Sequence, residues 1–309
     1  MLYVIADMTS LEKEISLNRT IMIKHWCSHD SISLVTPETF PTLSIETDAT
    51  LLFYFIRTYA HASTANIIPI LKKLVCSHTN IYFYIEDFYE VEKITKFCQC
   101  FHVKNIILSM KHDMYETLFK KQDFHVDILH HCFDLRMFPR EPPEKTYDIL
   151  LYGNANKMIY PIRSFLFKTL EKYHYKYKLK YIPMSTNYKR NEHSVTRDCL
   201  YREISRAKIC IATTGKYGFF TKKYQEIPLC HTVILGNMPL NYQSIFENFI
   251  LEFNSLDEKK LIQMIDDCLL EYERWFSKTK QLAEKIRSHF HMDQTFCEMK
   301  TIFPKILEK

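Results

Sequence analysis

Glycine is scarce in this chain of 309 residues, which has 4 glycines where average usage would give about 22. They stand at positions 153, 215, 218 and 236, so the first half of the chain has none. A glycine-rich phosphate-binding loop is therefore excluded from the first half and stays open only for the second.

Metal-binding cysteine pairs and export signals are also missing. The 10 cysteines include no C-x-x-C pair, so the finger-like spacings His25/His29 and His125/His130 are not completed into a zinc site. We expect buried thiols, which are typical of a reducing compartment. The N-terminus has no signal-peptide pattern, and the strongest apolar run, residues 51–56, is too short to span a membrane. These absences predict a cytoplasmic protein without a transmembrane segment.

The chain also lacks a large excess of charge of one sign. Lys and Arg number 41 against 36 Asp and Glu, and the net charge of +5 does not require nucleic acid but suits an anionic ligand. The chain is 47% hydrophobic and 25% charged, which excludes disorder, collagen and coiled coil as its main state. Its richness in Lys, Ile and Tyr is typical of an AT-rich genome, such as that of a large DNA virus.

Strand and helix patterns alternate along almost the whole chain. In the first half we expect strands at 2–7, 20–26, 31–36, 50–57, 80–87, 105–110 and 126–133. Helices are expected between them at 63–75, 90–101 and 112–121. Three prolines then follow within five residues, at 139, 142 and 143, and they predict a linker.

The alternation restarts after this linker. We expect strands at 147–154, 177–184, 208–213, 232–237 and 249–253, and helices at 161–174, 195–207 and 222–230. A long terminal helix is expected to start at Ser255, with Glu258 completing a capping box. The pattern predicts two α/β domains with largely parallel sheets, and a cleft between such domains is a favoured ligand site.

The first segment with chemistry follows the strand at 147–154. This strand ends near Gly153, where a ligand can approach the backbone closely, and a helix starts near Pro161 with free N–H groups. Arg163 adds a forked donor for phosphate. The same residues also fit a plain strand–helix turn with a surface arginine.

The second segment runs from Thr214 into the short helix at 222–230. Lys222 and Lys223 stand at its start and favour a diphosphate, while Glu226 can accept hydrogen bonds from the two hydroxyls of a ribose. A solvated Lys/Glu helix face is the alternative interpretation.

These motifs, in this order, resemble the donor half of two-domain glycosyltransferases, above all the group-1 branch that includes the spore-maturation (CgeB-like) proteins. The matching stretches are Y-D-I-L-L-Y-G-N at 147–154, Y-P-I-R at 160–163 and K-Y-Q-E-I-P-L-C-H at 223–231. That branch has K-Y-F-E-I-P-A-C-G at the last of these. In the first half, 81–90 and 130–139 resemble the stretch those enzymes carry ahead of their second domain.

The resemblance covers residues 80–300 and implies a GT-B fold, in which two Rossmann-like domains face a cleft. Domain 1–141 would take the acceptor, and domain 142–309 would bind a nucleoside-diphosphate sugar as substrate, with no tightly bound cofactor. By position, Glu226 matches the glutamate that holds the donor ribose. The other positions that match donor-site residues are Lys223, Tyr224, Gly153, Asn154 and Arg163, and the predicted site also includes Thr214 and Lys222.

Two positions depart from the pattern of the relatives. His231 stands where many have glycine, and Gly218 stands where many retaining relatives carry a second glutamate. The second departure leaves the donor-sugar contacts and the stereochemistry open. No Asp-x-Asp triplet occurs, which favours neutralisation of the diphosphate by Lys, Arg and helix dipoles without an obligatory metal.

An inverting transfer needs a base for the acceptor hydroxyl, expected at a strand end of the first domain. Asp87, together with Glu86, ends the strand at 80–87, and His61 follows the strand at 50–57. Asp87 fits a helix N-cap as well. His130 and His131 point to opposite faces of a strand, and we expect both to be structural.

These features predict a glycosyltransferase (EC 2.4) that moves a sugar from a nucleoside diphosphate to a hydroxyl of a glycan, lipid or protein. A non-catalytic nucleotide-sugar-binding module on the same scaffold is one alternative. A DNA-base glucosyltransferase is another, although a charge of +5 is small for a DNA-binding groove. The basic and aromatic run at 173–181 fits either nucleic-acid stacking or alternation on a half-exposed strand.

Overall fold

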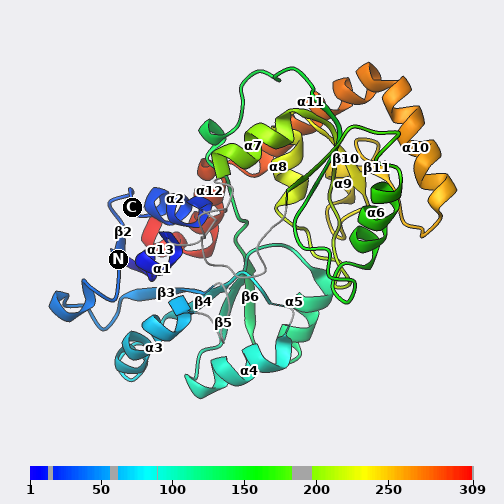
Figure 1. Cartoon of the computed structure of the whole chain (residues 1–309). Coiled ribbons are helices and arrows are strands. Elements are labelled where there is room, and N and C mark those ends of the chain that lie inside the picture. The colour runs from blue at the N-terminus through cyan, green and yellow to red at the C-terminus, as the bar shows by residue number, and fades with distance from the viewer. Residues whose placement is uncertain (13–16, 56–61, 89, 183–196, 308–309) are drawn as a thin grey trace. The chain divides into compact units, whose positions relative to one another are not determined.

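The computed structural model of the chain describes residues 1–12, 17–55, 62–88, 90–182 and 197–307. The chain divides into two compact units, Met1–Asp134 with Phe290–Lys309, and Leu135–His289. Each unit is built on one sheet, and the strands of both sheets pair in parallel within the described ranges (Figure 1). The predicted α/β class with two parallel sheets is confirmed.

The first unit has a six-stranded sheet, counted over the described residues, with the order β2-β1-β3-β4-β5-β6. Strand β3 is buried at every position, as expected for a strand that is covered on both faces. The strands are β1 (Leu2–Ile5), β2 (Ile32–Val35), β3 (Thr50–Phe55), β4 (Ile81–Ile85), β5 (Asn105–Leu108) and β6 (His125–Ile128). The helices are α1 (Met8–Glu12), α2 (Leu17–Trp26), α3 (Ala62–Leu74), α4 (Val91–Cys100), α5 (Asp113–Lys120), α12 (Met292–Ile302) and α13 (Pro304–Leu307), with a 3-10 turn at Phe40–Thr42.

The second unit has a sheet with the order β11-β10-β9-β7-β8. Helix α6 begins with Pro161, whose missing N–H would have no partner in a first turn. The strands are β7 (Tyr147–Tyr152), β8 (Leu179–Ile182), β9 (Ala207–Ile211), β10 (Val233–Gly236) and β11 (Leu251–Glu252). The helices are α6 (Pro161–Lys172), α7 (Arg197–Ser205), α8 (Lys223–Leu229), α9 (Gln243–Phe246), α10 (Glu258–Leu270) and α11 (Tyr272–His289), and a 3-10 turn at Leu135–Met137 precedes them.

Residues 20–26 were expected as a strand, and this prediction is wrong because they lie in helix α2. Met22, Ile23 and Trp26 are fully buried in the core of the first unit. Their spacing of one and three residues puts them on one helical face. A window of seven residues is too short to separate this helical period from the period of a strand.

The long terminal helix is interrupted. Helix α10 begins at Glu258, and Asp257, not Ser255, is its N-cap, because the Asp257 side chain accepts a hydrogen bond from the Lys260 N–H at 3.1 Å. The apolar pattern then continues through α11 and α12, although the helix breaks at Glu271 and again after His289. A continuous apolar stripe therefore does not require one continuous helix.

The last segment of the chain returns to the first unit, so the division differs from the expected boundary between 141 and 142. Met299, Phe303 and Leu307 are buried in the core cluster that also contains residues of β1 and α2. Figure 1 shows α12 and α13, in red, beside the blue helix α2. The three linker prolines lie within the second unit, because the division falls between Asp134 and Leu135.

Candidate functional site

The sheet of the second unit reverses its winding between β7 and β9. These strands are neighbours, but β8 lies on the far side of β7, whereas β10 and β11 lie on the far side of β9. Open parallel sheets bind their ligands outside the carboxyl ends of the strands at such a reversal. The loops that follow β7 and β9, residues 153–160 and 212–222, are therefore where the topology favours a ligand.

Arg163 of α6 ties these two loops together. Its side chain is 3% exposed, so the interpretation as a surface arginine is wrong. Nε and Nη2 donate to the hydroxyl and the carbonyl of Thr213, both at 3.0 Å, and Nη1 donates to the Asn154 carbonyl at 2.9 Å. The guanidinium also lies 3.9 Å from the ring centre of Tyr160. All of these partners are neutral, so they orient the positive charge without neutralising it.

Lys223 brings a second cation to the same place. It is buried, its Nζ donates to the Tyr152 carbonyl, and it lies 3.2 Å from the centre of the Tyr152 ring. A Cβ on Gly153 would lie 2.8 Å from this Nζ and 3.5 Å from Nη1 of Arg163. Burial, and then the charge of Arg163, lower the pKa of Lys223 well below its usual value. An anion at this point would stabilise both cations.

Glu226 points into the unit, not into solvent. It is 4% exposed, and the hydroxyls of Tyr152 and Tyr201 donate to its carboxylate at 3.3 and 3.4 Å. Burial and the charge of Glu226 raise the pKa of Tyr152 well above its usual value, so this hydroxyl keeps its proton. Because α8 is buried from Lys223 to Leu229, the interpretation as a solvated Lys/Glu face is wrong.

Thr214 and Tyr224 hold the ends of β9 and β10 together. The Thr214 N–H donates to Oδ1 of Asn237 at 3.2 Å, and the Asn237 amide donates to the Thr214 hydroxyl at 2.6 Å. The buried Tyr224 hydroxyl donates to the carbonyls of Ala212, at 3.3 Å, and Asn237. The two predicted residues thus link the carboxyl ends of β9 and β10.

The loops after β7 and β9 also contact each other directly. The Lys216 N–H donates to the Ile159 carbonyl at 2.7 Å, and Gly215, at φ +69°, lies so close that a Cβ would be 2.9 Å from the same oxygen. Asn154 is exposed in the first loop, and Lys222 is half-buried at the start of α8.

Both departures from the family pattern lie at left-handed backbone positions. Gly218 has φ +73°, and His231 has φ +56°. A glutamate at 218 would be strained in this conformation, so the loop is built for the glycine it has. His231 accepts the left-handed strain where the relatives have glycine, and its Nε2 lies 3.2 Å from the Pro139 carbonyl.

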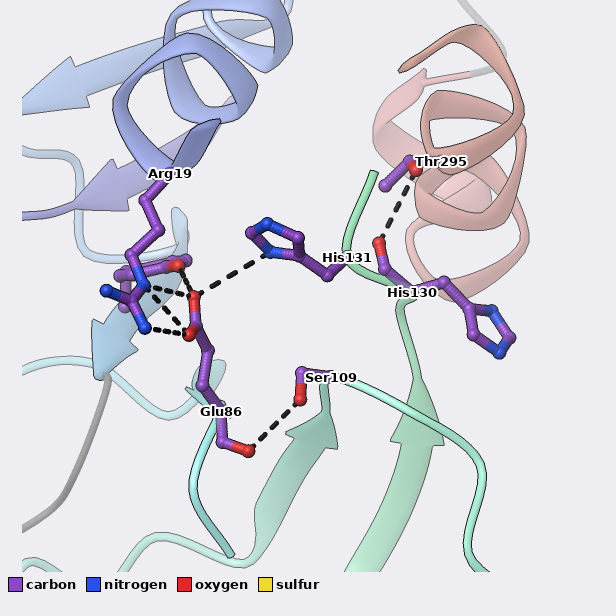
Figure 2. A network of polar contacts seen from close by, with 7 residues as sticks. Arg19, Glu86, Ser109, His130, His131 and Thr295 are labelled. Atoms are coloured by element: carbon purple, nitrogen blue, oxygen red, sulfur yellow. Dashed lines mark hydrogen bonds and ion pairs between the residues drawn. The ribbon is translucent and has the colours of Figure 1, made fainter. Parts of the chain in front are cut away.

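In the first unit, the predicted Glu86 is the centre of a buried polar network (Figure 2). It follows β4 and is 6% exposed. Arg19 of α2 donates to its carboxylate through Nε, at 2.9 and 2.8 Å, and through Nη2 at 2.6 Å, and the Tyr54 hydroxyl of β3 donates to it too. Figure 2 shows His131 pointing at the same carboxylate, with Nδ1 at 3.8 Å from Oε1.

This pairing makes Glu86 a poor proton acceptor, since a guanidinium stabilises the charged form of a carboxylate. Asp87, the next residue, is partly buried just after the end of β4. His61 lies outside the described residues. His130, at the end of β6, is engaged by Glu298 of α12 through its ring Nδ1 and its backbone N–H, both at 2.8 Å.

Sequence reasoning missed Tyr152, Tyr201 and Arg19 as members of these networks. Tyr152 and Glu226 are 74 positions apart, and Arg19 and Glu86 are 67 positions apart. Nothing local in the sequence indicates such partners. Tyr152 alone had a weak signal, because it is the last residue of a predicted strand that ends at a glycine.

Two further features concern metal and membrane. Among the residues that the structure describes, no group of three His, Cys, Asp or Glu side chains is placed to hold a metal ion. Over the same ranges, no helix combines the length and apolarity needed to cross a membrane.

Three residues of the basic and aromatic run at 173–181 contact acidic residues of α10. Tyr173 donates to Glu258 at 3.2 Å, and Tyr177 donates to Asp266 at 2.9 Å. Lys176 forms an ion pair with the same Asp266. These contacts give part of the run structural partners, whereas only its residues from Leu179 on lie in a strand, β8.

Comparisons with known proteins identify the fold. No family model matches the chain, and no curated protein sequence does. Sucrose-phosphate synthase from Thermosynechococcus elongatus superposes with a TM-score of 0.61 at 10% identity, over 99% of both chains. Anabaena HepE in complex with UDP-glucose gives 0.63 at 8% identity, over 98% of this chain and 99% of its own. The pneumococcal O-GlcNAc transferase GtfA, in complex with UDP and GlcNAc, gives 0.54 at 10% identity, over 88% and 60%.

The likeness to the first two structures covers nearly the full length of all three chains, while their identity to this chain stays near one residue in ten. Structural similarity at such a low sequence identity shows only that the folds are alike. Together with the two parallel sheets and their strand orders, it shows that the chain has the GT-B fold of these glycosyltransferases.

Proposed function

We propose that the chain is a glycosyltransferase that takes a sugar from a nucleoside-diphosphate donor and transfers it to a hydroxyl acceptor. The observation that carries this proposal is the pair of buried basic side chains, Arg163 and Lys223, at the winding reversal of the second sheet. Glu226 lies less than one helical turn along α8 from Lys223. The diphosphate and the ribose are the two constant parts of such donors. Arg163 and Lys223 are complementary to the diphosphate, and Glu226 is complementary to the ribose.

The chemistry follows from the charges. As the sugar leaves, negative charge grows on the diphosphate, and fixed cations in a buried site stabilise it at little reorganisation cost. Arg163 is held in place by Thr213 and Asn154, so its charge is oriented before the donor binds. We propose that these cations neutralise the leaving group without an obligatory metal.

The acceptor hydroxyl requires a base if the transfer inverts configuration. We propose Asp87 for this role, because the neighbouring Glu86 is committed to Arg19 and Tyr54. The acceptor, whether glycan, lipid or protein, would then bind at the carboxyl edge of the first sheet. We assign the chain to the group-1, CgeB-like branch on its K-Y-Q-E-I-P motif.

The structural neighbours support the donor class. HepE has been solved with UDP-glucose, which is a sugar nucleotide, and GtfA with UDP and GlcNAc, which are the two parts of another. Uridine diphosphate and its sugars are therefore the first ligands to test.

A thermal-shift screen with UDP, GDP and their sugars tests the proposal. A ligand at about 100 times its Kd adds about 2.7 kcal/mol of stability, which should raise the melting temperature by about 5 °C or more. Glu226→Ala should reduce the rise, because it removes the acceptor for the ribose hydroxyls while Arg163 and Lys223 remain for the diphosphate. Glu258→Ala is the matched control, since this glutamate pairs with Lys172 away from the site and should keep the rise. No shift with any of these ligands in the wild-type chain would contradict the proposal.

A non-catalytic nucleotide-sugar-binding module is the second candidate. Gly218, left-handed where retaining relatives have a glutamate, and the commitment of Glu86 to an arginine favour it. Turnover separates the two candidates. Release of UDP from a bound labelled donor, by transfer or hydrolysis, supports the enzyme, and tight binding without release across a donor panel supports the module.

A further inference from the structure

Tyr201 connects Glu226 to the start of the second unit. It belongs to α7, is 1% exposed, and its hydroxyl donates to Oε1 of Glu226 at 3.4 Å. Its ring stacks on Phe138, with 4.3 Å between the ring centres and 24° between the planes. Tyr152 also contacts Lys223, whereas Tyr201 reaches Glu226 from a different element, helix α7.

Phe138 is itself fixed by the segment in which it lies. The next residue, Pro139, has its carbonyl 3.2 Å from Nε2 of His231. Lys145, at the other end of this segment, donates to the His231 carbonyl at 2.7 Å and to the Ser205 carbonyl at 2.8 Å. The ring that supports Tyr201 is therefore anchored through the turn that directly follows α8, the helix of Glu226.

A ribose-binding glutamate needs such support. A glutamate side chain has several rotatable bonds, and a carboxylate that accepts hydrogen bonds from two neighbouring hydroxyls must hold one orientation. Tyr201 restrains one oxygen and Tyr152 the other, at 3.4 and 3.3 Å. Each carboxylate oxygen keeps further lone-pair positions for a ligand hydroxyl.

We propose that Tyr201 is a positioning residue of the donor site, which orients the Glu226 carboxylate toward the ribose hydroxyls and is itself held by the stack on Phe138. The inference rests on the proposed function and adds a specific claim to it. Loss of the Tyr201 hydroxyl should weaken only the part of the affinity that depends on the ribose hydroxyls. A general loosening of the unit would weaken every ligand alike.

The test uses the full chain and two probes, the nucleoside diphosphate that stabilises it (UDP or GDP) and the 2′,3′-dideoxy form of that nucleotide. Calorimetric titration measures both dissociation constants. Tyr201→Phe should weaken the natural nucleotide about fivefold and leave the dideoxy form within about twofold. In a Glu226→Ala background, Tyr201→Phe should have no further effect on either probe. Tyr177→Phe, which removes a hydroxyl bonded to Asp266 instead, is the matched control and should change neither constant.

Phe138→Leu is the second variant, and it keeps the inference testable if Tyr201→Phe does not fold. It removes the ring that stacks on Tyr201 but leaves the Tyr201 hydroxyl in the chain. As in Tyr201→Phe, the dissociation constant of the natural nucleotide should rise more than that of the dideoxy form. Equal weakening of both probes, or an unchanged constant for the natural nucleotide in both variants, would overturn the inference and leave the proposed function standing. Absence of nucleotide binding by the wild-type chain would overturn the proposed function itself.

Discussion

Arg163 and Lys223 bring two basic side chains to one buried place, and Gly153 is the residue that allows them to approach the chain there. Its φ of +94° is one that residues with a side chain rarely adopt. Its missing Cβ leaves the space in which the end of Lys223 lies. Both the positive φ and the close approach of Lys223 therefore favour glycine at this position.

Gly153→Ala should lower the free energy of unfolding by about 2–3 kcal/mol, since it adds left-handed strain to a steric conflict with Lys223. Urea denaturation measures the loss. In a Lys223→Ala background, which removes the atoms in conflict, the same change should cost only about 1–2 kcal/mol for the backbone strain. Equal costs in the two backgrounds would show that the contact with Lys223 is unimportant.

Part of this site could be predicted from the sequence. Arg163, Lys223 and Glu226 stand in short motifs next to strand ends, so their chemistry and their place in the sheet indicate a phosphate-bearing ligand. The tyrosines around Glu226 could not be predicted, because hydroxyl partners far along the chain follow only from the packing of β7 and α7. The burial of Arg163, Lys223 and Glu226 could not be predicted from the sequence either.

Among the elements, β9 and β10 approach each other with no space for a side chain at one point. A Cβ built on Gly236, the last residue of β10, would lie 1.6 Å from the carbonyl oxygen of Ala212, just after β9. The obstacle is backbone, so no rotamer change relieves it. The close approach also sets the position of Asn237, which binds Thr214 on the next strand end.

Gly236→Ala should therefore be more damaging than any other glycine substitution in the second unit, with a loss of about 3 kcal/mol or more in the free energy of unfolding. Urea unfolding and soluble yield both report it. Gly218→Ala is the comparison, since Gly218 is half-exposed with φ +73° and should cost about 1–2 kcal/mol from backbone strain. Similar losses for both variants would contradict the argument.

Prediction of elements succeeded where the pattern was long or strongly apolar. The six buried residues of β3 and the alternation of strands and helices from β3 to β10 follow from the sequence. Helix α2 was mistaken for a strand, because its apolar residues satisfy both periods over a short window. The breaks between α10, α11 and α12 have no sequence mark, since the apolar stripe runs through them.

On the scale of the whole molecule, buried bases and acids make stability depend on pH. Lys145 ties the starts of strands in the second sheet through its bonds to the Ser205 and His231 carbonyls. Burial lowers the pKa of Lys145 to about 7, whereas an unfolded lysine has a pKa of about 10.4. Between these values the unfolded chain carries a proton that the folded chain lacks, so raising the pH stabilises the fold.

Lys145→Met should remove this dependence. The free energy of unfolding of the wild-type chain, relative to the variant, should rise by about 2–4 kcal/mol from about pH 7 to about pH 10. Buried thiols act in the opposite direction, since burial raises the pKa of Cys210 to about 12, but they are common to both proteins and cancel in the difference. Parallel pH curves for the two proteins, from urea unfolding, would contradict the assignment.

The return of the chain to its first unit has a consequence for synthesis. That unit includes residues 1–134, yet its core lacks Met299, Phe303 and Leu307 until residues 290–307 have been synthesised. Residues 1–134 are thus made before the second unit but are completed after it, and they must wait with exposed apolar surface while that unit forms. A fragment cut after Asp134 would keep that gap permanently, so the two halves should be produced as one polypeptide.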